Sequence, residues 1–296
     1  MKKNKTKTET TGRKNISKGR DIWNRFKSNR NSIIGAVITL IFVFVAVFAP
    51  LIVSYEDDVI KQDIGNRLAL PGGDNPLGTD ELGRDIMARL IYAARMSLLI
   101  GVLGIIVAMS VGIVLGSIAG YFGGVLDNII MRICDIFDGI PSFLMALTIA
   151  AAFGANLTTL MIAIAFGTFA GQARIIRGAI LTVKNNEYVE AAKALGATDW
   201  QIICYHIIPN CMAVLIVQFS VKVASGILAA SSLSFLGLGV QPPDPEWGAM
   251  LSGGRAYLLD NPYLTLFPGL CIMLVILAFN MLGDGLRDAL DPRLKR

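Results

Sequence analysis

The stretch from Glu187 to Asn210, EYVEAAKALGATDWQIICYHIIPN, is polar and helix-forming within an otherwise apolar second half of the chain. The two asparagines before it can cap a first helix, whose opening turn carries acids that favour the helix dipole. Gly196 is placed to end that helix in a left-handed conformation. Thr198, followed three residues later by Gln201, predicts a capping box and an immediate second helix. We therefore predict two short helices that meet at a glycine corner.

Pro209 closes this stretch and is predicted to break or kink the backbone before the next apolar run. Ala191, Ala192 and Gly196 leave a low, bare ridge on the first helix and its corner. A ridge of this kind is suited to slot into a groove on another protein.

Bulk composition indicates a membrane protein. The 296 residues are 54% hydrophobic and 17% charged, with a mean hydropathy of +0.59, whereas a soluble domain of this size needs more surface charge. The formal net charge of +5 is concentrated in the tails. Four scattered cysteines without a C-x-x-C pair, and a single histidine, argue against a zinc site or a disulfide framework. We expect no metal and no cofactor.

Six apolar runs are predicted to cross the membrane, and the distribution of lysine and arginine predicts that both termini are cytoplasmic. The predicted spans are 33–53, 96–121, 141–153, 157–170, 209–236 and 263–282. The predicted parts are a basic cytoplasmic tail (1–32), the first span with an extracytoplasmic loop and an interfacial helix (33–92), a core of five spans (93–284) with 187–210 in the cytoplasm, and a cytoplasmic tail (285–296). The fold class is all-α.

Three segments allow more than one interpretation. In 78–98, Asp85 and Arg89 are spaced i, i+4 beside an apolar stripe, so this amphipathic helix either gates or binds something or anchors the chain on the membrane surface. The amphipathic segment 123–138 is predicted to lie at the inner surface. The basic residues of 1–30 either bind nucleic acid or lipid or, as we favour, fix the topology.

The second span has small residues at every fourth position. They are Gly104, Ala108, Gly112, Gly116 and Gly120. Such a face lets another helix approach closely in lipid, where packing drives association, and so it predicts a tightly packed bundle or dimer.

Lys222 is the one charge near the middle of a predicted span. Because a charge at bilayer depth costs at least about 2.5 kcal/mol, it should face the bundle interior, a partner or a water-filled cavity. It either contacts a passing solute, such as a peptide carboxylate, or pairs with an acid elsewhere or snorkels to the surface. Gln218 and Asn280 are weaker candidates of the same kind, and helix-to-helix hydrogen bonds would also explain them.

Catalytic motifs do not occur. The sequence has no G-x-x-x-x-G-K-[ST] loop to bind and hydrolyse ATP, no H-E-x-x-H and no G-x-S-x-G. A membrane bundle without catalytic residues, but with a cytoplasmic docking ridge, is predicted to be the non-enzymatic part of a machine powered by another protein.

Glu190-Ala191-Ala192, the Gly196 corner and Pro209 together resemble the EAA loop of binding-protein-dependent ABC importer permeases. Three longer stretches (78–98, 232–251 and 266–292) are similar to the second permease subunit of the oligopeptide, dipeptide and nickel importers. The family pattern has isoleucine where this chain has His206 and leucine where it has Ile208, and such subunits often carry glutamate at the position of Ala230.

This resemblance implies a type I importer permease in a prokaryotic plasma membrane. The expected partners are a homologous second permease subunit, two ATPase subunits, an extracytoplasmic solute-binding protein and the lipid bilayer. The expected cargo is a peptide or a nickel chelate. The residues expected to transmit motion from the ATPases are Tyr188, Glu190, Ala191, Ala192, Gly196 and Pro209. Lys222, Gln218 and Asn280 are the candidates for the pathway.

Two other classes of protein would explain part of the sequence. An ion-coupled secondary transporter would explain Lys222, but it should show internal repeats with broken helices and more buried acids. A DNA-binding membrane regulator would explain the basic tail, but the helix after Thr198 is short and offers no arginine for base edges. We therefore expect no nucleic-acid partner.

Overall fold

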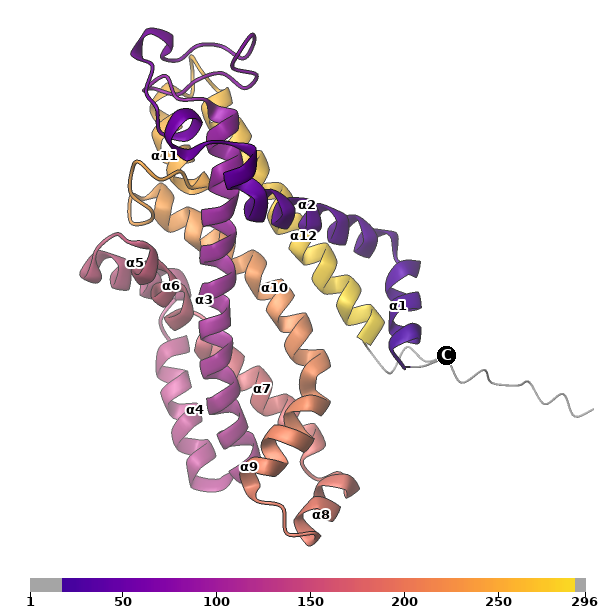
Figure 1. The fold of residues 1–296 in the computed structure, drawn as a ribbon. Coiled ribbons are helices and arrows are strands. Elements are labelled where there is room, and N and C mark those ends of the chain that lie inside the picture. The colour runs from indigo at the N-terminus through magenta and orange to yellow at the C-terminus, as the bar shows by residue number, and fades with distance from the viewer. Residues whose placement is uncertain (1–17, 291–296) are drawn as a thin grey trace, which may run out of the picture.

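The computed structural model describes residues 18–290, and the predicted tail residues 1–17 and 291–296 lie outside that range. Within it the chain is helical, without a β-strand (Figure 1). The helices are α1 (Lys18–Ser28), α2 (Arg30–Ile52), η1 (Tyr55–Val59), η2 (Ile64–Asn66), α3 (Ile86–Phe122), α4 (Gly124–Asp138), α5 (Ser142–Phe153), α6 (Leu157–Phe166), α7 (Phe169–Val183), α8 (Glu187–Ala194), α9 (Asp199–Gln201), η3 (Ile202–Ile207), α10 (Ile208–Phe235), α11 (Trp247–Gly254), η4 (Arg255–Tyr257) and α12 (Tyr263–Leu290).

Four helices are long and apolar enough to cross a membrane. They are α2, α3, the continuous helix Asp199–Phe235 that contains α10, and α12. Two further pairs reach that length only as bent units, α4 with α5 at an angle of 79° and α6 with α7 at 46°. The fold is therefore all-α, as predicted, with four helices that can span a membrane, or six spans if each bent pair counts as one.

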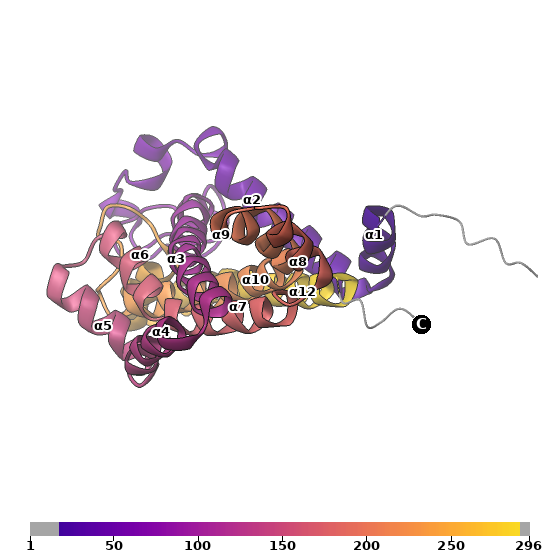
Figure 2. The same ribbon diagram turned by 90° about the horizontal axis from the view of Figure 1, so that it is seen from below.

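The third and fourth spans differ from their predicted form. They were predicted over 141–153 and 157–170, but α5 and α6 contain only 12 and 10 residues, which at about 1.5 Å per residue is too short for a ~30 Å hydrocarbon core. Each depends on its neighbour. The segment 123–138, predicted at the inner surface, is α4, which packs along α3 and α7 as half of a bent unit (Figures 1 and 2). Pro141 causes the first bend, because the residue before a proline disfavours helical geometry.

α3 is one helix of 37 residues, so the separate interfacial helix predicted within 78–98 does not form. The residues from Ile86 onward are its first turns, since no glycine or proline interrupts the apolar pattern before Gly101. Asp85 does not pair with Arg89. Its side chain accepts a hydrogen bond from the Ala88 backbone N–H at 2.8 Å and caps the helix.

The small-residue face of α3 packs against α7. A Cβ atom added to Gly116 would lie 2.6 Å from the carbonyl oxygen of Ala173, and one added to Gly112 would lie 2.7 Å from the Cβ of Gln172. Gly104 faces Ile164 of α6 in the same way. The predicted close approach is confirmed, and its partner lies within this chain.

Pro209 does not break the helix, contrary to the prediction. The helix is continuous from Asp199 to Phe235, and the turn before the proline, Ile202–Ile207, is a π-helix. The wider i to i+5 spacing absorbs the hydrogen bond that proline cannot donate, so the helix passes through Pro209 without ending.

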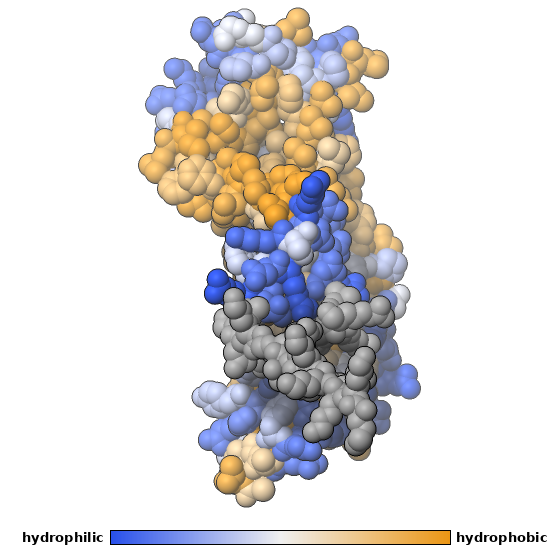
Figure 3. Space-filling view, turned by 90° about the vertical axis from the view of Figure 1, so that its right-hand side faces the viewer, coloured by the Kyte–Doolittle hydropathy of each residue, from blue (hydrophilic) through white to orange (hydrophobic). Residues whose placement is uncertain are grey.

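The outward faces of α2 and α12 are apolar, as surfaces in contact with lipid should be. Figure 3 shows a broad hydrophobic area over the upper part of the molecule and polar surface below it. The exposed residues of α2 include Val37, Leu40, Phe44, Val47 and Leu51, and those of α12 include Leu266, Leu270, Met273 and Leu277.

Candidate functional site: the α8–α9 corner and the polar face of α10

The corner between α8 and α9 is closed by backbone hydrogen bonds that require a left-handed residue. Gly196 has a φ of +84°. The N–H of Ala197 donates to the carbonyl of Ala192 at 3.1 Å, and the N–H of Gly196 donates to the carbonyl of Lys193 at 3.0 Å. These two bonds form a Schellman motif, in which glycine meets the least steric resistance.

The capping predictions have different outcomes at the two helices. Thr198 and Gln201 form the predicted capping box at the start of α9. Asn186 occupies the N-cap position of α8, but its side chain makes no capping hydrogen bond. The second helix therefore begins immediately after the corner, which fixes the angle between the two.

One side of the corner packs inward. Val189 and Ala192 are buried in an apolar cluster with Ile202 and Ile207. Ala192 was predicted to belong to the docking ridge, but it is only 7% exposed and supports the corner from inside. The other five residues predicted to transmit motion from the ATPases are exposed, namely Tyr188, Glu190, Ala191, Gly196 and Pro209.

Three large side chains at the corner project into solvent, and none of them is among the residues predicted from the sequence. Leu195 is 88% exposed, Trp200 59% and Tyr205 75%. Side chains of this size, gathered at the tip of a segment outside the hydrophobic area, are typical of a protein–protein contact. Spacing did not identify Leu195, because it follows Val189 and Ala192 at three-residue intervals, as a buried leucine would.

The corner is tied to the end of α3. The hydroxyl of Tyr121 donates a hydrogen bond to Asp199 at 2.6 Å, and the ammonium of Lys193 lies 5.2 Å from the centre of the Tyr121 ring. The ammonium of Lys184 donates to the Gly120 carbonyl at 3.0 Å. A displacement of the corner therefore acts directly on the last turn of α3.

Salt bridges fix α7 to α4 beside this junction. The guanidinium of Arg177 donates two hydrogen bonds to the carboxylate of Asp127, the second at 2.6 Å. Arg174 pairs with Asp135 at 2.9 Å and with Asp138 at 2.7 Å. The bidentate Arg177–Asp127 pair is the stronger type of contact, because its planar groups match in geometry.

α10 carries polar side chains on its outward side, among exposed apolar residues such as Leu228 and Met212. Gln218, Lys222, Ser225 and Ser232 follow one side of the helix at spacings of 4, 3 and 7 residues. Ser225 is exposed, and the other three are half-buried. The opposite side, with Ile227 at its centre, packs on α3. Lys222 makes no ion pair with any residue between 18 and 290.

A groove of about 470 Å³ lies between α10 and the last turns of α12. Its polar lining consists of Gln218, Asp284 and Arg287. Asn280 is exposed on α12 one turn before Asp284, but neither it nor Lys222 lines the groove. The structure thus joins only Gln218 of the three predicted pathway residues to this groove.

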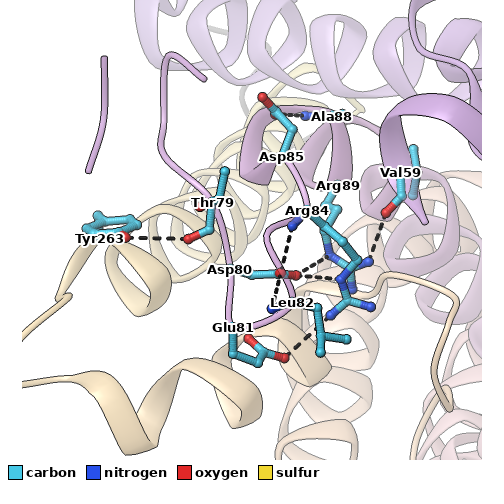
Figure 4. Close-up of polar contacts among 10 residues, drawn as sticks. All are labelled: Val59, Thr79, Asp80, Glu81, Leu82, Arg84, Asp85, Ala88, Arg89 and Tyr263. Carbon is cyan, nitrogen blue, oxygen red and sulfur yellow. Dashed lines mark hydrogen bonds and ion pairs between the residues drawn. The ribbon is translucent and has the colours of Figure 1, made fainter. Parts of the chain in front are cut away.

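Asp80, Arg84 and Arg89 form a buried cluster of ion pairs at the start of α3, at the end of the molecule opposite the α8–α9 corner (Figure 4). The Asp80 carboxylate accepts a hydrogen bond from Arg84 Nε at 2.7 Å and lies 3.4 Å from Arg89 Nε. Arg89 also donates to the carbonyl of Val59 at 3.1 Å, and the hydroxyl of Tyr263 donates to the Thr79 carbonyl at 3.4 Å. These contacts join the loop after α2, the start of α3 and α12. These contacts anchor the loop to the bundle, which differs from the predicted anchor on the membrane surface; gating or binding by this segment stays a prediction.

A second buried contact holds α11. Glu246 is fully buried and caps this helix by accepting a hydrogen bond from the Ala249 N–H at 2.9 Å. It also accepts hydrogen bonds from the hydroxyls of Ser97 at 3.0 Å and Ser231 at 3.5 Å. One carboxylate therefore links α3, α10 and α11.

Tyr55 connects the same loop to the segment before α11. Its hydroxyl donates to Asp244 at 2.5 Å. This bond, together with burial and the negative charge of Asp244, raises the pKa of Tyr55 to about 12.

Among residues 18–290, no three side chains of the metal-ligating types gather closely enough to hold a metal ion.

The fold is shared with chains of solved ABC transporters. The chain matches a protein described as "Inward facing conformations of the MetNI methionine ABC transporter" with a TM-score of 0.56 and 16% identity, over 70% of this chain and 98% of that one. It matches a chain of "an amino acid ABC transporter with histidines" with a TM-score of 0.52 and 17% identity, over 68% and 94%. The chain therefore has the fold of chains found in solved ABC transporters.

The sequence comparisons then identify the family. Residues 112–296 match the binding-protein-dependent transport system inner membrane component, and residues 17–71 match the N-terminal TM domain of oligopeptide transport permease C. The chain is 43% identical to the dipeptide transport system permease protein DppC of Alkalihalophilus pseudofirmus, over 95% of this chain and 91% of the relative. It is 40% identical to the glutathione transport system permease protein GsiD of Pectobacterium atrosepticum, over 93% and 91%. The chain belongs to the binding-protein-dependent transport system inner membrane component family.

Proposed function

We propose that this permease subunit carries peptides across a prokaryotic plasma membrane, driven by ATPase subunits that dock on the α8–α9 corner. The observation that carries the proposal is the corner itself, where Leu195, Trp200 and Tyr205 are exposed beside a junction with α3. The relatives named as dipeptide and glutathione permeases support peptides as the cargo. The further partners are a homologous second permease subunit and an extracytoplasmic solute-binding protein.

The proposed mechanism divides the corner into contact residues and supporting residues. Leu195 and Trp200 contact the ATPase, together with the predicted residues Tyr188, Glu190 and Ala191. Ala192 holds α8 on the bundle, and Pro209 lies at the entry to α10. When the ATPases bind ATP and close, they displace the corner. The Tyr121–Asp199 hydrogen bond and the continuous helix into α10 pass that displacement to the membrane-spanning helices.

Gly196 sets the angle at which the corner meets its partner. A valine there must adopt a φ of +84°, which β-branched residues strongly disfavour. No atom lies within 4 Å of the added Cβ, so the strain is confined to the backbone of the corner. We expect G196V to remain in the membrane but to uncouple ATP hydrolysis from uptake.

The test compares exposed leucines at the two ends of the molecule. Leu195 is 88% exposed at the corner, and Leu259 is 96% exposed near the opposite end of the bundle. In the complex reconstituted in vesicles, L195A and W200A should weaken retention of the ATPase and reduce ATP-driven peptide uptake. L259A should leave retention of the ATPase at its wild-type value. Wild-type retention and uptake in L195A and W200A would show that the ATPases dock elsewhere.

We further propose that the polar face of α10 borders the cargo pathway and that Lys222 pairs with the carboxylate of the peptide. Every peptide with a free C-terminus carries that carboxylate, and a cation without a partner in the described chain is suited to bind it. Ser225 and Ser232 continue the face along the helix. An acid on the second permease subunit is the competing partner. If Lys222 binds the peptide, K222M should lower uptake while the two permease subunits still co-purify. If K222M instead loses the second permease subunit on purification, Lys222 pairs with an acid on that subunit.

Water access tests the pathway independently. With exposed Cys204 replaced by serine, S225C in the assembled complex should react with a membrane-impermeant thiol reagent during transport. L40C is the matched control, because Leu40 is 69% exposed on the apolar face of α2 and should stay unreactive. Equal, negligible labelling of both positions would remove α10 from the pathway and leave the docking proposal intact.

A further inference from the structure

α1 lies where the chain enters its first membrane-spanning helix. Only Asn29 separates α1 from α2. The Asn29 side chain caps α2 by accepting a hydrogen bond from the Asn31 N–H at 3.0 Å, and it donates another to Asp288 of α12 at 3.2 Å. Figure 1 shows α1 turned sharply away from α2 at this residue. Because α2 is an apolar span, α1 lies at the membrane surface where that span begins.

The rotation of α1 about its axis is fixed by packing. Phe26 is buried, and Arg25 pairs with Asp21 at 3.2 Å. The indole of Trp23 is 54% exposed and lies parallel to the Phe26 ring, and the ammonium of Lys27 lies 4.8 Å from its centre. A half-exposed tryptophan beside a cation is typical of helices at the level of lipid headgroups, where one end of the ring is apolar and the other meets water.

The exposed charge around Trp23 is basic. Arg20, Lys27 and Arg30 are exposed, and none of them makes an ion pair within residues 18–290. The sequence before α1, residues 1–17, adds six basic residues and one acid. A basic cluster directly before a membrane-spanning helix attracts anionic lipids, with an effect of roughly fivefold per cation at the surface.

We propose that α1 is a binding surface for anionic phospholipid headgroups. Trp23 sits at the headgroup level, and Arg20, Lys27 and Arg30 contact the phosphates of the surrounding lipids. This surface is distinct from the ATPase-docking corner and does not depend on cargo. It ties the α2 and α12 ends of the bundle to the charge of the adjacent leaflet.

The test measures which lipid lies next to Trp23. The full chain is placed in nanodiscs that contain both phosphatidylglycerol and phosphatidylcholine, with only one of the two brominated on its acyl chains. A W200F background removes the exposed tryptophan of the corner, and the difference between this protein and its W23F derivative assigns the quenching to Trp23. At equal mole fraction, brominated phosphatidylglycerol should quench Trp23 several times more than brominated phosphatidylcholine.

Two triple variants carry the same change in charge. R20Q/K27Q/R30Q should bring the quenching ratio of the two lipids close to one, and added salt should lower the wild-type ratio. K61Q/R67Q/R255Q removes three exposed cations elsewhere and should leave the ratio unchanged. Equal quenching by both lipids in the wild-type chain, or no quenching by either, overturns the proposal. A ratio unchanged in R20Q/K27Q/R30Q also overturns it.

Discussion

Gly116 is the position at which a single methyl group most directly tests how α3 and α7 are held together. In G116A the new Cβ would lie 2.6 Å from the carbonyl oxygen of Ala173 and 3.1 Å from the backbone nitrogen of Arg177. Both neighbours are backbone atoms, which cannot rotate away. Comfortable contact needs about 3.5 Å or more, so the helices must separate by roughly 0.5–1 Å.

The magnitude follows from two opposing effects. Overpacking of this kind costs about 1–3 kcal/mol, while alanine is about 1 kcal/mol better than glycine inside a helix. G116A should therefore be destabilised by up to about 2 kcal/mol. Gly178, on the exposed side of α7, has no atom within 4 Å of an added Cβ, so G178A should gain up to about 1 kcal/mol.

The assay is denaturant unfolding of the purified chain in detergent, followed by helix content and by tryptophan emission. The two variants should differ by about 1–3 kcal/mol, with G178A the more stable. This comparison cancels the effects of detergent and of helix propensity. If G116A unfolds at the same midpoint as G178A, α3 and α7 are not in close backbone contact, and the small-residue face of α3 does not hold them together.

The remaining predictions concern single polar contacts. E246A removes the cap of α11 and leaves two serine hydroxyls without their acceptor, so its free energy of unfolding should fall by about 3 kcal/mol, and by clearly less in E246Q, measured by the same denaturant titration. Y121F removes the hydroxyl that binds Asp199 but keeps the ring below Lys193; stability should change by less than about 1 kcal/mol, while ATP-driven uptake by the reconstituted complex falls. D127N leaves Arg177 without its paired charge, and its thermal unfolding temperature should drop more than that of the exposed control R132Q.

Local signals in the sequence were sufficient for the corner and for the four long membrane-spanning helices. A glycine between helix-forming residues, and the Thr198–Gln201 pair three residues apart, are decided by neighbouring backbone groups. The four-residue repeat of small side chains on α3 likewise needs only helical geometry to form a flat face. Its partner was not evident from that repeat, because α7 is distant in the sequence.

The features missed from the sequence depend on contacts between distant segments. Asp80 joins Arg84 and Arg89, and Arg89 reaches Val59 across 30 positions, contacts that the spacing of Asp85 and Arg89 along one helix does not show. The bend between α6 and α7 has no proline to mark it in the sequence, unlike the bend at Pro141. Exposure of Leu195 is a property of the folded corner, since the same residue pattern fits a buried leucine.

α3 connects the two ends of this arrangement. A helix of 37 residues is about 55 Å long, and it is continuous from the capping Asp85 to Phe122. Near its start, Arg89 is held by Asp80 and Val59; in its last turn, Tyr121 is bonded to the α8–α9 corner. Because this helix is packed along its length, we propose that it transmits a displacement at the corner as a movement of the whole element. The buried contacts of Asp80 with Arg84 and Arg89 at the far end would then shift the loop after α2, on the face where we expect the solute-binding protein to deliver its cargo.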